Sequence, residues 1–472
     1  MFSLVLMVLP SVASAGGFYA GDGGVRATGR AGAFVAGAND LSAMSYNPAA
    51  LSRVGNQLTF GLAGVHQAVW FQRDDEPFND LTFDPVRNQA PPLPIPSIAG
   101  SLDFGVEDLT VAFGVYTPYS PSWSYDPNGA QRFASTETLV LAGNVGPSVS
   151  YRFADRLSVG AGVAWTFMSV DQTLVAHVAP LSFPAEDDPA YDVTTRVQVF
   201  DWARVTGNVG LMYETVDKRV AVGASYVPQI RYRPRGSLTA DFSKNTYYTG
   251  ESGFGQVIAE PSAADDDVVL NIVLPHTVRL GVLVRPAPHW ELELDLVWEN
   301  WASMPPLEVT DLQLTIPTTL AEDAVVNEAV ALPLKMQDAY SVRLGAEGAI
   351  SDRTRLRGGL AFESSSLAPD QRSVLLPDGH KLTWALGASV EAVPKTLTLD
   401  FAYSQSLIFP ASTSPSGVFQ VQIDPQTGAV GTGKAVGNGQ LGALTSIVGL
   451  GLNWTPRTKR MRTPDSPVEE EA

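Results

Sequence analysis

Cysteine is absent from the 472 residues of this chain, and histidine occurs only 5 times. The absence of thiols excludes disulfides, cysteine-type zinc sites and thiol nucleophiles. The histidines are scattered and form no HExxH motif or other ligand spacing, so we expect no metal site and no cofactor. Basic residues are scarce as well: 31 Lys and Arg stand against 49 Asp and Glu, and the net charge of −18 argues against nucleic acid as a partner.

Long apolar runs are missing too. Beyond the N-terminus no stretch of about 18 uncharged apolar residues occurs, so the sequence offers no transmembrane helix. Hydrophobic residues nevertheless make up 45% of the chain and charged residues only 17%, which is apolar for a water-soluble protein. The chain therefore needs another way to bury apolar surface.

A period of two runs from about residue 57 to the C-terminal region. In 289–300 (HWELELDLVWEN), Trp or Leu at each even position from 290 to 298 alternates with acidic residues at 291, 293, 295 and 299. Such alternation puts apolar and polar side chains on opposite faces of a strand. Many strands with an apolar outer face and a polar inner face fit a transmembrane β-barrel, in which lipid replaces the core. We predict strands at 57–73, 96–105, 109–118, 138–153, 156–171, 197–215, 219–242, 269–285, 289–303, 338–350, 353–364, 379–393, 396–409 and 440–454.

The connections support an all-β, 14-stranded antiparallel barrel in a bacterial outer membrane. Tight turns follow the even-numbered strands, whereas long polar loops follow the odd-numbered strands. Short periplasmic turns and long external loops are typical of such barrels, and both chain ends then lie in the periplasm. Hydrolases of this membrane need an assembled Ser/His/Asn or Asp/His set. The sequence offers none, so we predict no catalytic residues and no enzyme.

The chain divides into four predicted parts. Residues 1–15 are a signal peptide, with an apolar stretch and an Ala-Ser-Ala cleavage site, although no Lys or Arg precedes the stretch and the true start codon stays open. Residues 16–56 are rich in Gly and Ala and lack alternation, which favours a plug in the lumen over a soluble periplasmic extension. Residues 57–454 form the barrel, and 455–472 form a polar periplasmic tail that we expect to be disordered.

Charged residues occupy inward positions on three strands that we expect to be neighbours. Pairs of opposite charge across these strands would brace the inner wall; alternatively, they would hold the plug or tune what passes. These lumen residues are Glu291, Glu293, Asp295, Arg343, Arg355 and Arg357. Acidic clusters at 74–76, 186–188 and 265–267 lie in predicted loops, where they are either solvated or bridge divalent cations to lipopolysaccharide.

The N-terminal segment 16–51 (GGFYAGDGGVRATGRAGAFVAGANDLSAMSYNPAAL) closely resembles the hatch of the FadL family. This family comprises outer-membrane transporters of long-chain fatty acids and related hydrophobic compounds. The resemblance rests on Phe18 and on the motifs GRAG at 29–32, AND at 38–40 and NPA at 47–49. It continues with FGVYTPY at 113–119, PSVSYRFADRLSVGAG at 147–162, LPHTVRLGV at 274–282 and LPDGH at 376–380, and so covers 16–454.

The resemblance implies a passive transport route without ATP, metal or proton chemistry. The ligand enters a hydrophobic groove among the loops and moves to a site near the hatch. A shift of the N-terminal residues releases it sideways through a gap in the barrel wall at a kink in the third strand. Phe18 would lie near the ligand, and Asn47, Pro48 and Ala49 would form the hatch element next to the inner site.

Gly114 and Pro118 lie in that third strand, and both residue types weaken a ladder. For Gly114, simple interior packing is the alternative to the kink. The expected partners are a hydrophobic small molecule and the lipid and lipopolysaccharide of the outer membrane, and we expect a monomer.

The substrate stays open between two classes. Fatty-acid transporters of this family offer cationic groups to the carboxylate, but strand 156–171 has Arg156 only at its periplasmic end. Arg343, Arg355 and Arg357 could substitute, but acidic residues accompany them. Neutral aromatic or aliphatic hydrocarbons are therefore the alternative substrate, and a non-transporting surface barrel used for adhesion is the alternative from another class.

Overall fold

A computed structural model describes residues 23–76, 80–183, 187–332 and 334–456. The expected signal peptide, Phe18 and all but two residues of the expected tail lie outside these ranges. Among the described helices, none is long and apolar enough to cross a membrane. The helical segments are α1 (Val25–Thr28), α2 (Ala43–Tyr46), η1 (Pro48–Arg53), η3 (Pro189–Tyr191), α3 (Thr246–Thr249), η4 (Trp301–Ser303) and η5 (Pro369–Gln371).

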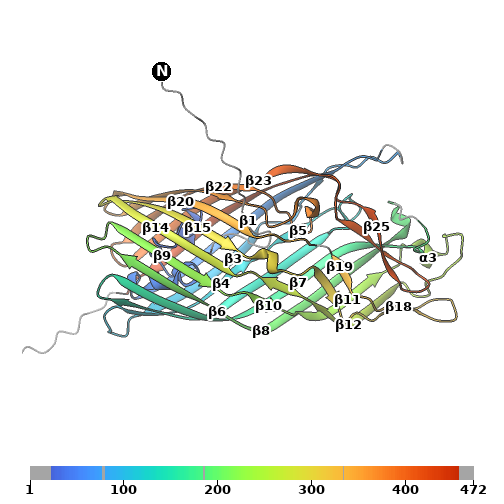
Figure 1. The fold of residues 1–472 in the computed structure, drawn as a ribbon, viewed down its shortest axis with the longest axis horizontal. Helices are drawn as coiled ribbons and strands as arrows, with labels where there is room; N and C mark the ends of the chain where they lie inside the picture. Colours follow the sequence, from blue (N-terminus) through green and yellow to red (C-terminus); the bar gives the residue numbers. More distant parts are fainter. Residues whose placement is uncertain (1–22, 77–79, 184–186, 333, 457–472) are drawn as a thin grey trace, which may run out of the picture.

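The wall is a closed antiparallel barrel of 14 strands, as the sequence predicts (Figure 1). The last strand pairs with the first along nearly its whole length, from Leu58↔Trp454 to Arg73↔Gly439. The wall strands are β1 (Gln57–Arg73), β3 (Leu93–Leu102), β4 (Leu109–Tyr119), β6 (Glu137–Phe153), β7 (Leu157–Val178), β8 (Asp192–Glu214), β9 (Val220–Val227), β14 (Thr277–Ala287), β15 (Trp290–Glu299), β20 (Ala339–Ser351), β21 (Thr354–Glu363), β22 (Lys381–Val393), β23 (Leu397–Thr413) and β26 (Gly439–Trp454).

The alternation seen in the sequence has the expected orientation. On β15, Trp290 and Leu292 are 51% and 49% exposed, whereas Glu293 and Asp295 are 2% and 0% exposed. This pattern of exposure is the reverse of that in a water-soluble protein, because the apolar face contacts lipid and the polar face is covered by residues inside the barrel.

Two predicted strands are broken by proline. The segment 219–242 forms β9, β10 (Ile230–Tyr232) and β11 (Arg235–Asp241), with breaks at Pro228 and Pro234. Its neighbour forms β12 (Ser262–Leu270), β13 (Ile272–Leu274) and β14, with a break at Pro275. Proline has no N–H for the ladder, and β10 and β13 therefore pair as a separate two-stranded piece.

The long connections contain more structure than the sequence indicated. They carry short strands that pair with one another or with the ends of wall strands. These are β2 (Val86–Arg87), β5 (Ser122–Ser124), β16 (Leu307–Thr310), β17 (Leu314–Ile316), β18 (Ala324–Val326), β19 (Val330–Leu332), β24 (Phe419–Ile423) and β25 (Val430–Ala435). The end of the barrel with the long loops is thus a folded cap, opposite the end with the short turns (Figure 1).

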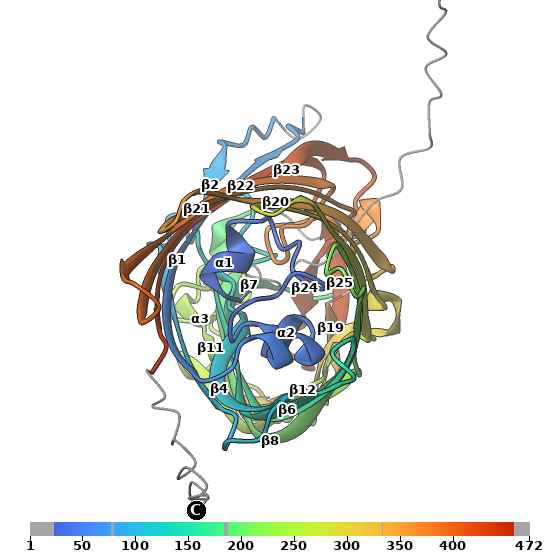
Figure 2. The same cartoon turned by 90° about the vertical axis from the view of Figure 1, so that its left-hand side faces the viewer.

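The segment 23–53 lies inside the barrel, with α1 and α2 visible in the lumen (Figure 2). Phe34, Leu41, Met44 and Leu51 of this segment form a buried apolar cluster. A separate and larger buried cluster lies among the loop strands and the wall-strand ends that carry the long loops. We call the segment 23–53 the hatch.

Candidate functional site

The element Asn47-Pro48-Ala49 fixes the hatch to the wall. Asn47 is fully buried, and its amide nitrogen donates to the carbonyls of Val35 and Leu211 at 3.0 and 3.1 Å. Its Oδ1 accepts from the Ala49 N–H at 3.1 Å. One side chain therefore links two stretches of the hatch to β8.

Glycines in the wall make room for this element. A Cβ built on Gly160 of β7 would lie 2.3 Å from the Ala49 nitrogen, and one on Gly210 of β8 would lie 2.0 Å from the Asn47 Oδ1. Neither distance is compatible with a side chain. At Gly160 the hatch backbone touches the wall backbone, and at Gly210 the Asn47 side chain touches the wall backbone.

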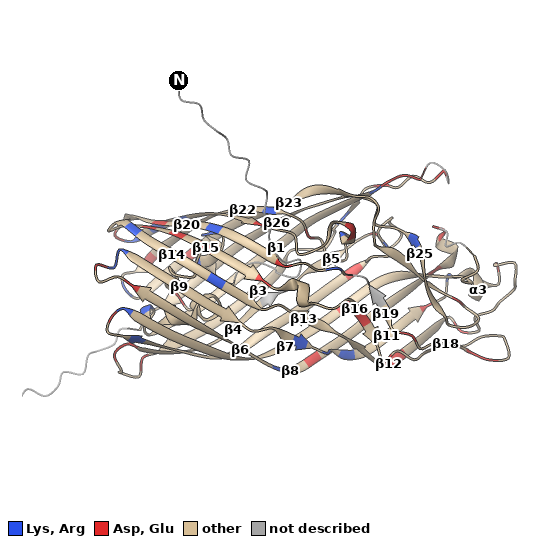
Figure 3. Cartoon of the chain, viewed as in Figure 1, with Lys and Arg blue, Asp and Glu red and all other residues tan. Residues whose placement is uncertain are grey.

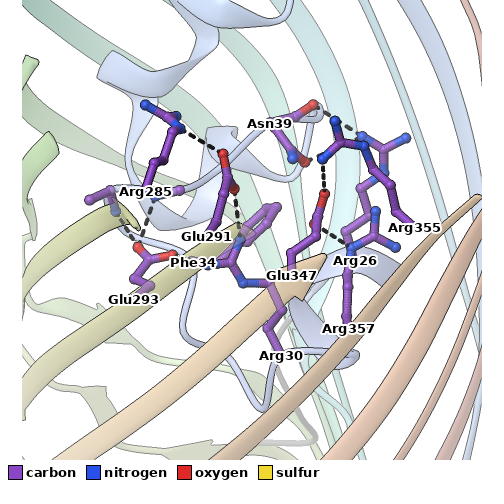
Figure 4. Close-up of polar contacts among 12 residues, drawn as sticks. Arg26, Arg30, Phe34, Asn39, Arg285, Glu291, Glu293, Glu347, Arg355 and Arg357 are labelled. Atoms are coloured by element: carbon purple, nitrogen blue, oxygen red, sulfur yellow. Dashed lines mark hydrogen bonds and ion pairs between the residues drawn. The ribbon is translucent and has the colours of Figure 1, made fainter. Parts of the chain in front are cut away.

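Carboxylates of β15 bind the hatch from the other side. The Glu293 carboxylate accepts from the N–H groups of Ala36 and Gly37 at 2.6 and 2.8 Å. It also accepts from Nη2 of Arg30 at 2.6 Å, and both side chains are fully buried (Figure 4). Asp295 accepts from the N–H groups of Phe34 and Val35 at 2.7 and 3.0 Å.

The remaining predicted lumen charges extend this network. Glu347 of β20 pairs with Arg357 at 2.7 Å and with Arg355 at 3.0 Å (Figure 4). Glu291 accepts from Arg285 at 2.9 Å. The sixth residue, Arg343, is buried, forms an ion pair with Glu363 at 3.6 Å and donates to the Gly32 carbonyl at 3.4 Å. All six predicted residues therefore contact the wall or the hatch. The contacts run both between strands of the wall and from the wall to the hatch.

A large apolar cavity lies above the hatch, in the half of the barrel that carries the long loops. Its empty volume is about 1160 Å³, and its lining has no charged residue among the described residues. Val170, Leu270, Ile316 and Ile423 are examples from the wall and the loop strands. Such a volume and lining fit a hydrophobic small molecule.

A second cavity, which we call the inner cavity, lies directly against the hatch. It has an empty volume of about 990 Å³ and is lined by Met44 and Tyr46 of the hatch, by wall strands β6 to β8, and by Leu274 of β13. Leu270 and Ile272, four and two residues before Leu274, line the upper cavity. The two cavities therefore follow one another along the same stretch of chain.

Arg279 of β14 lines the inner cavity, and the sequence analysis did not identify it. Its Nε and Nη1 are buried and have no hydrogen-bond partner among the described residues. The guanidinium carbon lies 6.0 Å from the centre of the Tyr46 ring, and the cross-strand neighbours are Val297 and Ser225. An arginine without an ion pair among the described residues is unusual in this lumen, where Arg30, Arg343 and Arg357 each pair with a glutamate.

A third cavity, of about 530 Å³, adjoins the hatch at strands β1, β3 and β4. It shares Met44, Ser45 and Tyr116 with the inner cavity. Phe60 and Ile98, which are 46% and 42% exposed on the lipid side, also line it. The cavity thus reaches from the hatch into the barrel wall.

The wall is incompletely paired at this point. The ladder between β3 and β4 runs only from Leu102↔Val111 to Ile98↔Val115, although β3 continues to pair with β1 as far as Leu93. The β4–β6 ladder is irregular between Tyr116 and Tyr119. Gly114 is therefore in the last paired stretch, where a Cβ would approach Met44 of the hatch to 3.1 Å, and Pro118 lies within the irregular segment.

Two prolines of β3, which the sequence analysis did not single out, explain the gap. Pro94 and Pro96 have the same parity, so both missing N–H groups belong on the same side of the strand. The ladder with β1 continues through both positions, whereas the ladder with β4 does not. The missing donors therefore face β4.

Some of the loop acids are engaged in ion pairs. Asp187 pairs with Arg73 and with Arg132, the latter at 2.7 Å, and Glu76 pairs with Arg73 at 2.9 Å and with Lys434. Within the described ranges no group of three or more acidic or histidine side chains could hold a metal ion. Trp301, within the predicted strand 289–303, is fully buried and donates to Glu299 at 3.0 Å.

The fold and the site together define the class: a transmembrane β-barrel that contains a hatch, with hydrophobic cavities between the hatch and the long loops. A family model described as outer membrane protein transport protein (OMPP1/FadL/TodX) matches residues 6–437. The chain belongs to this family, which is a family of transport proteins and not of enzymes. Its location is the bacterial outer membrane, which it crosses many times.

Individual relatives are distant in sequence. The long-chain fatty acid transport protein of Escherichia coli (strain K12) is 22% identical over 314 residues, which is 65% of this chain and 61% of that protein. The chain thus spans about three fifths of that relative. A crystal structure of a Pseudomonas aeruginosa FadL homologue has a TM-score of 0.72 at 18% identity, covering 93% of this chain and 100% of that one. The Pseudomonas putida toluene transporter TodX has a TM-score of 0.64 at 15% identity, covering 93% and 100%.

Proposed function

We propose that this protein takes up long-chain fatty acids across the outer membrane by passive diffusion. The observation that carries the proposal is Arg279, a half-buried cation at the wall of an otherwise largely apolar inner cavity, whose buried Nε and Nη1 have no hydrogen-bond partner among the described residues. A guanidinium is a strong partner for a carboxylate, and the adjacent apolar surface receives the acyl chain at roughly 0.8 kcal/mol per buried CH₂. The name of the Escherichia coli relative agrees with this substrate class.

In the proposed route, the acyl chain first enters the upper apolar cavity and then the inner cavity, where the carboxylate meets Arg279. It leaves through the third cavity and the unpaired wall between β3 and β4. Three features support this order: the consecutive lining by Leu270, Ile272 and Leu274, the shared residues Met44 and Tyr116, and the exposed Phe60 and Ile98. With a lateral exit, an amphipathic ligand enters the lipid directly and does not cross an aqueous pore. Phe18, which the family resemblance places near the ligand, stays a prediction.

The test compares oleate and toluene uptake in a host that lacks its own transporter. Arg279→Met removes the charge but keeps an unbranched apolar side chain, and Arg279→Lys keeps the charge. A hydrogen bond to a charged group contributes about 2 kcal/mol, so Arg279→Met is expected to weaken oleate binding about thirtyfold. Toluene uptake should change little, and Arg279→Lys should retain most oleate uptake.

Three results would count against the proposal. If Arg279→Met lowers oleate and toluene uptake equally, the residue supports the cavity and does not recognise a carboxylate. If the wild-type protein takes up toluene but not oleate, the substrates are neutral hydrocarbons. If neither compound enters, the barrel is not a transporter of these classes, and adhesion becomes the hypothesis to test.

A further inference from the structure

The outer surface of this acidic protein carries exposed arginines on β8 and along the segment from β10 to β11, and blue positions are visible near β8 in Figure 3. We call Arg196, Arg231, Arg233 and Arg235 the arginine strip. All four are exposed, and Tyr232, between two of them, is 2% exposed and points inward. Since the chain has a net charge of −18, a group of four arginines on its outer wall differs from the average composition of the chain.

The strip lies at the end of the apolar belt that is nearer the long loops. On β7, Leu157 and Trp165 are 42% and 45% exposed and bound a run of outward apolar residues. This run spans roughly 26 Å along the strand, or roughly 20 Å after tilting, close to the apolar band of about 25 Å in such barrels. Trp165 stacks on Trp202 of β8, with ring centroids 6.5 Å apart, and the pair marks the interface with the outer leaflet.

The register places the arginines at this level. Phe200, whose ring contacts Trp202 at 4.2 Å, is the cross-strand partner of Arg235. The backbone N–H of Arg233 donates to the carboxylate of Asp201 at 2.8 Å, and Asp201 is the residue between Phe200 and Trp202. The strip is therefore beside exposed aromatic rings at the height of the lipid headgroups.

Two of the four guanidinium groups have no acidic partner. Arg196 pairs with Asp171 at 2.6 Å, and Arg235 lies 3.5 Å from the exposed Asp267. For Arg231 and Arg233, no ion pair occurs within the described part of the chain. The Asp201 carboxylate is already bonded to Arg204 Nε at 2.8 Å and to the backbone.

We infer that the arginine strip binds the phosphate groups of a phosphorylated glycolipid of the outer leaflet, that is, the lipid A part of lipopolysaccharide. The planar fork of arginine matches phosphate oxygens, and free guanidinium groups at headgroup height meet those phosphates directly. Trp202 and Val205, 65% and 73% exposed, offer apolar surface to the acyl chains below. The site is outside the barrel and independent of the proposed transport route.

The experiment measures lipid binding to the purified, detergent-solubilised chain by native mass spectrometry. Wild type is compared with Arg231→Gln/Arg233→Gln and with the control Arg219→Gln/Arg353→Gln, which removes two exposed arginines at the short-turn end. The probes are lipopolysaccharide, the same lipid with its phosphates removed, and inorganic phosphate. Heat-modifiable gel mobility shows that each variant is folded.

Wild type and the control should bind lipopolysaccharide equally. Arg231→Gln/Arg233→Gln should bind it about thirtyfold more weakly, the loss expected for two basic residues at an anionic surface. The dephosphorylated lipid and inorganic phosphate should bind little to any variant. Equal binding by wild type and Arg231→Gln/Arg233→Gln would overturn the inference, as would equal binding of the dephosphorylated lipid. Strong binding of inorganic phosphate alone would identify a free-anion site and also overturn it.

Discussion

Replacing Glu293 by alanine should release the hatch without unfolding the barrel. The carboxylate satisfies the Ala36 and Gly37 N–H groups and the fully buried Arg30 guanidinium. Removing one partner of a buried ion pair costs about 3–5 kcal/mol. Glu291 lies 3.8 Å from Arg30 and offers partial replacement, so the lower figure of about 3 kcal/mol applies.

Hydrogen exchange of the hatch amides measures this effect. A loss of about 3 kcal/mol in the free energy of local opening should accelerate exchange at residues 34–37 roughly a hundredfold. Amides of the wall ladders should exchange at the wild-type rate, because none of their hydrogen bonds is changed. Glu293→Gln keeps the size and one acceptor oxygen but loses the charge, so it should fall between wild type and Glu293→Ala.

The control is Glu107→Ala, which removes an exposed carboxylate in the β3–β4 turn. It should leave hatch exchange unchanged. If Glu293→Ala gives wild-type exchange at residues 34–37 in a barrel that is still folded, the carboxylate does not hold the hatch. The network would then only brace the wall.

Two further variants test the contacts of the hatch and the wall gap. Gly210→Val forces a side chain against Asn47, so the hatch should lose about 1–3 kcal/mol of seating stability and become more sensitive to protease; Gly64→Val, at a wall glycine with open space, should not. Equal sensitivity of both variants would contradict a direct contact between the Asn47 side chain and the Gly210 backbone. Pro94→Val/Pro96→Val restores two N–H groups toward β4 and should close part of the gap, which lowers oleate uptake several-fold while binding to the purified protein stays constant. Pro394→Ala in a short turn is the control, and unchanged uptake by the β3 variant would exclude this gap as the exit.

The strand pattern could be predicted because lipid and lumen act on each residue separately. Every second side chain of β15 faces acyl chains whatever its sequence neighbours are, so the alternation is visible in the local sequence. The breaks in 219–242 are local in the same sense, because each follows from a single proline that lacks an N–H for the ladder. The loop strands were missed because their pairing depends on distant segments; β24, for example, pairs with the end of β7 in parallel.

The site could be predicted only in part. The lumen acids could be identified from the alternation of side chains along each strand. Their contacts with the hatch could not, because these contacts join residues about 260 positions apart, such as Arg30 and Glu293. Arg279 lies within LPHTVRLGV, a motif that the resemblance already included. Its importance became visible only from the register, which places Val297 and Ser225 beside it and no acid.

The arrangement of contacts around the hatch explains why the exit should be on one side. Buried ion pairs hold the hatch toward β15 and β23, through Glu293 and through Arg26–Asp400 at 2.9 Å. Close contacts with the backbone of Gly160 and Gly210 hold it toward β7 and β8. Toward β3 and β4 the hatch faces a cavity and an unpaired stretch of wall. Small movements of the hatch are therefore least opposed on the side where the wall already lacks hydrogen bonds, and opening there breaks no buried ion pair.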